Sequence, residues 1–256
     1  MKGCVEPPQA LLADIDGVLL LDGRVLPGTV ELARIFARRL ALISNNSTHS
    51  QEDLCKVFAK AGVAVEPEQF FLAGVDTIRQ MAHDLPGGRV LALCNTGMCA
   101  LLRKNGLLSL PVQCWQEADA VLLCRDTEIN YAKLEAAANA AQVGVPVYCA
   151  NPDITHPGAK GIHLETGCLL ALLKTAAPEL NLRLMGKPKP ALALAALDFV
   201  RAEARQALFI GDNLATDGAC AQAVGIPFLH VGSAGGLSLE QALRSLRPCS
   251  NRPNLI

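Results

Sequence analysis

The chain has 256 residues, of which 51% are hydrophobic and 18% are charged, and its formal net charge at pH 7 is −1. This length is sufficient for one large domain or two smaller ones. The near-neutral charge gives no electrostatic reason to expect nucleic acid or an anionic membrane as a partner. No uncharged apolar stretch approaches the roughly 18 residues that a membrane-spanning helix needs, and the first residues lack the apolar run of a signal peptide.

Short apolar runs alternate with helical patterns through most of the chain. In chain order, the predicted elements are strand 10–14, helix 29–38, strand 40–44, helix 51–61, helix 75–84, strand 90–93, helix 97–105, strand 120–123, helix 131–142, strand 145–149, helix 165–175, strand 182–185, helix 191–200, strand 207–210, helix 216–224, strand 227–230 and helix 239–246. This alternation predicts an α/β fold, in which helices cover both faces of a parallel sheet. Such sheets bind their ligands at the carboxyl ends of the strands.

The first strand ends in two acidic residues, Asp14 and Asp16, followed by Gly17. If the extended conformation persists, residues two apart point to the same side, so the two carboxylates would lie together at the edge of the sheet. Paired acidic oxygens are suitable ligands for Mg²⁺, and one of them could attack phosphorus. On this segment alone, a solvated acidic pair at the end of a strand is an equally good interpretation.

Polar residues also lie at or just after the ends of three later strands. They are Ser44 at the end of strand 40–44, Lys187 after strand 182–185, and Asp212 and Asp217 after strand 207–210. Taken singly, each segment is also typical of a turn, a helix cap or a solvated loop. Together, in this order and in an α/β pattern, they favour a phosphoryl-transfer site, which depends on positioning and on neutralising the charge of the phosphoryl oxygens.

We assign Asp14 as the nucleophile, which would form an aspartyl phosphate. Asp16 would protonate the leaving oxygen and then deprotonate the attacking water. The Ser44 hydroxyl and the backbone N–H groups of the following turn would bind phosphate, and Lys187 would supply a positive charge. Asp212 would complete the Mg²⁺ ligands.

These motifs resemble those of the haloacid dehalogenase-like hydrolase superfamily: Asp14-Ile15-Asp16-Gly17-Val18, Ser44-Asn45, Lys187-Pro188 and Gly211-Asp212-Asn213-Leu214-Ala215-Thr216-Asp217. The resemblance implies that Mg²⁺ is held by Asp14, Asp212 and the backbone carbonyl of Asp16. It further implies that Ser44, Asn45 and Lys187 bind the phosphate. Asp217 and Asn213 would not touch the substrate, and Asp217 would orient Lys187 or a metal-bound water.

A long interval with its own strand and helix alternation separates the second motif from the third, which predicts an inserted domain. Its position resembles a type-2 cap, and segments around Asp126, Asn151 and Glu165 resemble the NagD-like, or nitrophenylphosphatase-like, branch. The resemblance implies a Rossmann-like core over 1–75 and 182–256 and a smaller α/β cap over 76–181. It also implies a homodimer formed through the cap.

Within the predicted cap, Asn151 and Asp153 are the residues expected to face the substrate, although Asn-Pro-Asp is also a good turn sequence. Ten cysteines are present without a Cys-x-x-Cys motif, and most lie in apolar settings. We therefore expect free, largely buried thiols in a reducing cytoplasm rather than disulfides or a zinc site.

The predicted function is that of a Mg²⁺-dependent phosphatase acting on small phosphorylated metabolites, such as nucleoside monophosphates or sugar phosphates. Two alternatives come from other classes. A phosphate-accepting signalling module would accept one phosphoryl group and stop, and a catalytically silent protein would only bind a phosphorylated metabolite. The inserted domain argues against the first alternative, and the retention of both Asp14 and Asp16 argues against the second.

Overall fold

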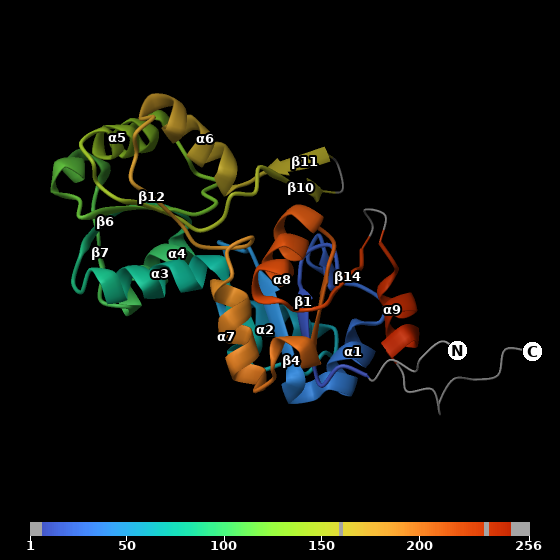
Figure 1. Cartoon of the computed structure of the whole chain (residues 1–256). Helices are drawn as coiled ribbons and strands as arrows, with labels where there is room; N and C mark the ends of the chain where they lie inside the picture. The colour runs from blue at the N-terminus through green and yellow to red at the C-terminus, as the bar shows by residue number, and fades with distance from the viewer. Residues whose placement is uncertain (1–6, 159–160, 233–235, 247–256) are drawn as a thin grey trace, which may run out of the picture. The chain divides into compact units, whose positions relative to one another are not determined.

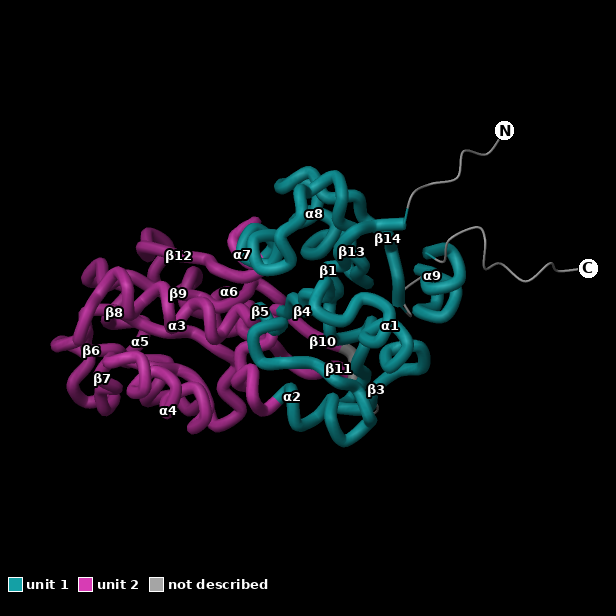
Figure 2. The backbone as a smooth tube through the Cα atoms, turned by 90° about the horizontal axis from the view of Figure 1, so that it is seen from below, with its two compact units in different colours: residues 1–44, 54–71, 193–256 teal, residues 45–53, 72–192 magenta. Residues whose placement is uncertain are grey.

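The computed structural model describes residues 7–158, 161–232 and 236–246. Its backbone divides into two compact units (Figure 2). The terminal unit comprises residues 1–44, 54–71 and 193–256, and the inserted unit comprises residues 45–53 and 72–192. Each unit is built on a five-stranded sheet, and each is described below by itself.

The sheet of the terminal unit has the strand order β14-β13-β1-β4-β5. Its strands are β1 (Ala10–Asp14), β4 (Leu40–Ser44), β5 (Phe70–Leu72), β13 (Ala207–Gly211) and β14 (Phe228–His230). Strand β1 lies between β13 and β4 and pairs with both in parallel, and β13 pairs with β14 in parallel. Every residue of β1 and of β4 is buried, as continuous apolar runs predict for central strands covered on both faces.

The sheet of the inserted unit has the strand order β12-β9-β8-β6-β7, and all of its neighbours pair in parallel. Its strands are β6 (Arg89–Leu93), β7 (Leu108–Ser109), β8 (Ala120–Leu123), β9 (Val147–Cys149) and β12 (Leu182–Leu184). Helices α3 (Ala73–Asp84) and α4 (Thr96–Lys104) cover one face, and α5 (Tyr131–Gln142) and α6 (Thr166–Ala176) cover the other (Figure 1). Two buried apolar clusters, one for each face, make this unit a three-layer sandwich.

The remaining helices are α1 (Thr29–Phe36), α2 (Gln51–Lys60), α7 (Ala191–Val200), α8 (Ala219–Val224) and α9 (Leu239–Leu246). Two antiparallel hairpins are formed by β2 (Leu20–Leu21) with β3 (Arg24–Val25) and by β10 (Thr155–Gly158) with β11 (Gly161–Leu164). Single 3₁₀ turns cover Ala37–Arg39, Pro67–Gln69 and Ala204–Gln206, and Val112–Glu117 forms two short turns with a kink at Cys114. Within the described ranges, every helix is too short or too polar to cross a membrane.

The predicted α/β class is confirmed, and six predicted elements have the predicted bounds: strands 10–14, 40–44 and 120–123 and helices 131–142, 191–200 and 239–246. The prediction of one helix over 216–224 is wrong at its start, because a wide π-type turn over Leu214–Gly218 precedes α8. The carbonyl of Asn213 causes this widening, since it accepts from the backbone N–H groups of both Asp217 and Gly218. The two hairpins and strands β5 and β7 were not predicted, because runs of two to four residues give little periodicity.

The inserted unit extends beyond the predicted cap of 76–181 on both sides, and it includes Asn45 and Lys187. The bounds predicted for the functional domains stay a prediction. The eight cysteines that the structure describes are free thiols, and Cys94, Cys124, Cys149 and Cys220 among them are buried. The other two, Cys4 and Cys249, lie outside the described residues.

One partly buried hydrogen bond joins strand β9 to the end of helix α3. The Tyr148 side chain is 1% exposed, and its hydroxyl donates to Oδ2 of Asp84 over 2.8 Å. The Arg183 guanidinium lies 5.4 Å from the centre of the tyrosine ring. The hydroxyl bond is the main reason why the pKa of Asp84 lies below its usual range.

We expect Tyr148→Phe to lower the free energy of unfolding by about 1–2 kcal/mol at pH 7, because it removes a hydrogen bond to a charged acceptor. A lowered carboxyl pKa stabilises the fold above the unfolded-state pKa, and this contribution disappears as pH falls and Asp84 becomes protonated. The difference from wild type should therefore shrink below about pH 4. Urea unfolding between pH 7 and pH 3 measures it.

The matched control is Tyr131→Phe, because Tyr131 is 82% exposed. This variant should unfold like the wild type at every pH. Equal losses of stability in the two variants, or a Tyr148→Phe deficit that does not change with pH, would contradict the assignment.

Candidate active site

The site in the terminal unit begins where β1 ends. Asp14 is the last residue of β1 and is buried, whereas Asp16 is exposed. Gly17 makes the turn with a φ of +83°, in the left-handed region that favours glycine, and its N–H donates to the carbonyl of Leu20 over 2.7 Å. A Cβ at position 17 would overlap the carboxylate of Asp212, so the glycine is required both by the backbone turn and by this close approach.

Three carboxylates converge at the carboxyl ends of β1 and β13. One oxygen from each of Asp14, Asp212 and Asp217 lies within 4.8 Å of the other two. Asp217 is fully buried, Asp14 is 6% exposed and Asp212 is half-buried. Like charges this close repel one another, and burial removes the water that would screen them. A set of hard oxygen donors at this spacing fits a divalent cation such as Mg²⁺.

The π-type turn delivers the third carboxylate of this cluster. Asp217 Oδ2 accepts from the backbone N–H of Asn213 over 3.2 Å, and Asn213 Oδ1 caps the turn by accepting from Ala215 over 2.9 Å. A Cβ at Gly211 would overlap Asp217, so the strand end must be a glycine for this carboxylate to fit. The sequence position of Asp217 predicted that it orients Lys187 or a metal-bound water without touching the metal. The cluster geometry also permits direct contact with a cation.

The Asp16 carboxylate belongs to a different group of side chains. Its Oδ2 accepts from the hydroxyl of Ser44, which is buried at the end of β4, over 3.1 Å. Asp14 and Asp16 are therefore not an equivalent acidic pair, since one lies in the acidic cluster and the other is bound to a hydroxyl. This division is compatible with a metal contact through the backbone carbonyl of Asp16, which stays a prediction.

In the inserted unit, the side-chain amide of Asn45 fixes the backbone of Lys187. Asn45 Oδ1 accepts from the Lys187 N–H over 2.8 Å, and Asn45 Nδ2 donates to the Lys187 carbonyl over 3.1 Å. The same Nδ2 donates to Oδ2 of Asp153 over 3.0 Å. A Cβ at Gly186 would overlap Asn45 Oδ1, so the glycine before the lysine lets the two segments approach. The structure thus joins two predicted phosphate-binding residues and one predicted substrate-facing residue.

Asn151 forms hydrogen bonds to two residues of this network, Asn45 and Asp153. Its Nδ2 donates to the Asn45 carbonyl over 2.7 Å and to the Thr166 hydroxyl over 3.3 Å, and its Oδ1 accepts from the Asp153 N–H over 3.1 Å. Asn151 is fully buried, and this geometry favours a positioning role over the substrate contact expected for it. The half-buried Asp153 remains the predicted residue for contact with substrate.

Sequence reasoning missed a second set of polar contacts in the inserted unit. Glu165 accepts from Nδ1 of His156 over 2.6 Å and lies 3.5 Å from the Arg125 guanidinium. Burial raises the pKa of Glu165, and its contacts with Arg125 and His156 oppose that effect. Buried Ser47 links the segment after Ser44 to this region, because its hydroxyl accepts from the Arg125 N–H over 3.0 Å. No spacing in the sequence signals these pairings, which depend on the packing of distant segments.

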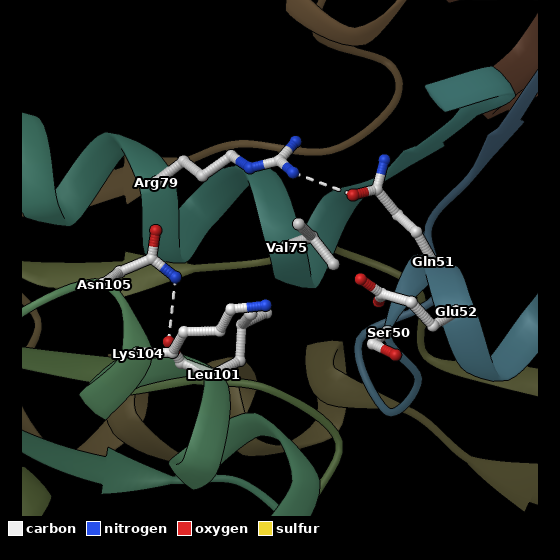
Figure 3. A pocket seen from close by; sticks show the side chains of 8 residues that line it. All are labelled: Ser50, Gln51, Glu52, Val75, Arg79, Leu101, Lys104 and Asn105. Carbon is white, nitrogen blue, oxygen red and sulfur yellow. Dashed lines mark hydrogen bonds between the residues drawn. The ribbon is translucent and has the colours of Figure 1, made fainter. Parts of the chain in front are cut away.

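A pocket of about 160 Å³ lies in the inserted unit between α3, α4 and the start of α2 (Figure 3). It is lined by Ser50, Gln51, Glu52, Val75, Arg79, Leu101, Lys104 and Asn105. The Arg79 guanidinium donates to Gln51 over 2.7 Å, and Asn105 donates to the Leu101 carbonyl over 2.8 Å. None of the predicted site residues lines this pocket. We therefore do not assign it as the reaction centre.

Comparison with known families gives matches at both ends of the chain. The model of haloacid dehalogenase-like hydrolases matches residues 11–108, and a second model of the same superfamily matches residues 184–250. A dihydroxyacetone phosphatase from Corynebacterium glutamicum is 27% identical over 80% of this chain and 74% of its own length. A D-glycerol 3-phosphate phosphatase from Mycobacterium tuberculosis is 30% identical over 90% of this chain, which spans 65% of that protein.

Solved structures agree with these matches. The p-nitrophenyl phosphatase from Archaeoglobus fulgidus shares the fold, with a TM-score of 0.81, 24% identity and coverage of 97% of this chain and 95% of its own. NagD from E. coli has a TM-score of 0.77 and 25% identity over 92% of this chain and 91% of its own. A glycerol phosphate phosphatase from Mycobacterium tuberculosis, solved in complex with magnesium, has a TM-score of 0.78 and 28% identity over 89% of this chain and 69% of its own.

The motif order, the acidic cluster at the carboxyl ends of β1 and β13, the family matches and the NagD-type neighbours agree with one another. The chain therefore belongs to the haloacid dehalogenase-like hydrolase superfamily, in its NagD-like branch of phosphomonoester hydrolases.

Proposed function

We propose that this chain is a Mg²⁺-dependent phosphatase that hydrolyses small phosphorylated metabolites through an aspartyl phosphate on Asp14. The observation that supports the proposal is the division of roles at the end of β1. Asp14 lies in a cluster of three carboxylates, while Asp16 is exposed and bound to the Ser44 hydroxyl. Mg²⁺ held by Asp14, Asp212 and the Asp16 carbonyl would neutralise charge on the phosphoryl oxygens.

In the first step, an Asp14 carboxylate oxygen bonds to phosphorus, and the ester P–O bond breaks. The Asp16 carboxyl gives its proton to the leaving alcohol. In the second step, Asp16 takes a proton from water, the water oxygen bonds to phosphorus, and the bond from phosphorus to Asp14 breaks to release inorganic phosphate. The Ser44 hydroxyl and the Lys187 ammonium would hold the phosphoryl oxygens in both steps.

The substrates proposed are phosphate monoesters small enough for a capped site, with nucleoside monophosphates and sugar phosphates among them. The relatives named for dihydroxyacetone and glycerol 3-phosphate make three-carbon phosphates the first compounds to test. A phosphate-accepting signalling module and a silent phosphometabolite-binding protein remain the alternatives, and multiple turnover distinguishes the enzyme from both. The cytoplasmic location and the homodimer through the cap stay predictions.

We expect Asp14→Asn to lower phosphate release by at least about a thousandfold, because the nucleophile is lost. Asp16→Asn is the matched control, since it makes the same chemical change two residues away. It should still form phosphoenzyme, slowly, and then fail to hydrolyse it. Phosphate release with Mg²⁺ and mass spectrometry of the quenched protein measure the two steps. Wild-type turnover by Asp14→Asn would exclude Asp14 as the nucleophile.

Removal of divalent cations with a chelator should stop turnover, and added Mg²⁺ should restore it. Asp217→Asn should need about 10- to 100-fold more Mg²⁺ for half-maximal activity, because it weakens the acidic cluster. A Mg²⁺ titration of the two proteins makes the comparison. Full activity in the chelated wild type, or an unchanged Mg²⁺ requirement in the variant, would count against a metal site at this cluster.

The Asn45 amide should be a positioning group for Lys187. We expect Asn45→Ala to lower kcat by about 10- to 100-fold with a smaller change in KM, because a small displacement of the lysine weakens contacts made in the transition state. Asn46→Ala is the matched control, since the Asn46 amide oxygen closes its own turn by accepting from the N–H groups of Thr48 and His49. Steady-state kinetics measure kcat and KM for both variants. Equal decreases in kcat would indicate general damage to the loop and would contradict the positioning role.

A further inference from the structure

We propose that Cys94 and Cys99 form a reversible dithiol–disulfide site in the inserted unit, which hydroperoxides oxidise. The two sulfurs lie 3.3 Å apart. Cys94 directly follows β6, and Cys99 lies in the first turns of α4. A disulfide needs the sulfurs at about 2.0 Å, so the bond requires a movement of little more than 1 Å, within reach of side-chain rotation.

The backbone between the two cysteines is fixed by Asn95. Asn95 Oδ1 caps α4 by accepting from the Met98 N–H over 2.9 Å, and its carbonyl accepts from the Cys99 N–H over 3.0 Å. The strand end and the helix start therefore hold the two sulfurs in contact before any oxidation occurs.

The two thiols differ in exposure and in chemistry. Cys94 is buried, and Cys99 is half-buried. The hydrogen bond between the two sulfurs is the main cause that lowers the pKa of the Cys99 thiol to about 6, against the opposing effect of burial. The charges of Arg103 and Lys133 act in the same direction, and the Asp126 carboxylate opposes them. Cys99 is therefore the thiolate that meets an oxidant, and Cys94 is the thiol that resolves the product.

The reaction takes two steps. The Cys99 thiolate attacks one peroxide oxygen and the O–O bond breaks. The departing oxygen gains a proton and leaves as water from hydrogen peroxide, or as an alcohol from an organic hydroperoxide. The Cys94 sulfur then attacks the Cys99 sulfur, the S–O bond of the sulfenic acid breaks, and water leaves with the Cys94 proton. Two thiols lose two electrons in total, and the hydroperoxide gains them.

Other described thiols have different surroundings. The Cys55, Cys149 and Cys168 sulfurs contact backbone carbonyls at 3.6, 3.2 and 3.1 Å. Cys124 lies near the pair but is fully buried, and its burial raises the pKa of its thiol. It is the competitor that a test must separate from Cys94.

The pair is connected to the segment that follows Ser44. Asn95, which lies between the cysteines, donates from Nδ2 to the Thr48 carbonyl over 2.8 Å. A disulfide would close a ring of residues 94–99 that includes Asn95, and would thereby constrain the hydrogen bond from Asn95 to Thr48. Oxidation should therefore be detected at residues 45–53, the segment that contains Asn45.

The experiment treats the reduced full-length protein with stoichiometric hydrogen peroxide, alkylates the remaining thiols and maps the peptides. The expected product is lighter by about 2 Da, carries a Cys94–Cys99 cross-link and returns to the starting mass with dithiothreitol. Cys94→Ser should stop at a sulfenic acid on Cys99, which dimedone traps, and Cys99→Ser should give neither product. Cys114→Ser, which changes another half-buried thiol, is the control and should oxidise like the wild type.

A wild-type protein that forms no cross-link, or that joins Cys124 in place of Cys94, overturns the proposal. Because this readout comes from the wild type, it does not depend on the folding of a variant. Hydrogen exchange tests the connection to the loop. We expect at least about a threefold change in exchange over 45–53 on oxidation of the wild type and none in Cys99→Ser. Equal exchange in oxidised and reduced wild type would overturn the connection.

Discussion

Electrostatic repulsion among Asp14, Asp212 and Asp217 is the constraint on which the terminal unit depends. Three carboxylates within 4.8 Å, two of them buried, cannot all carry charge at low cost unless a cation or a dense set of donors compensates them. The surrounding sequence is built for this approach, because Gly17 and Gly211 leave room where any Cβ would overlap a carboxylate. Glycine loses more conformational entropy on folding than other residues, so these two positions cost stability. Binding of a hard cation by the carboxylate oxygens would compensate for that cost.

The inserted unit depends on a different constraint, which is the position of Lys187, a residue with a long side chain. Asn45 binds both the N–H and the carbonyl of Lys187, so the backbone from which this buried side chain extends is held on both sides. Because the same amide also donates to Asp153, the positions of a phosphate-binding residue and of a residue predicted to meet the substrate are not independent. A displacement of Asp153 would therefore shift Lys187 through the Asn45 amide, and the reverse also holds.

Sequence reasoning predicted what depends on local pattern. Apolar runs that end in polar residues located β1, β4 and β13 to within a residue, because continuous burial leaves a clear signature. Contacts between distant segments could not be predicted in this way. The widened turn that brings Asp217 into the acidic cluster depends on a carbonyl that accepts twice, and the place of Asn151 depends on hydrogen bonds to the distant Thr166 and Asn45. Neither leaves a signature in spacing or composition.

The two sheets follow the same topological rule, and it accounts for the position of the cysteines. Parallel strands place whatever follows their carboxyl ends along one edge. In the terminal unit this rule gathers the acidic cluster after β1 and β13. In the inserted unit it places Cys94 after β6 and Asp126 after β8, with Lys133 bound to Asp126 over 2.7 Å. The Cys99 thiol is therefore close enough to Lys133 and Asp126 for their charges to act on it. This position gives the contact between Cys94 and Cys99 a chemical role beyond packing.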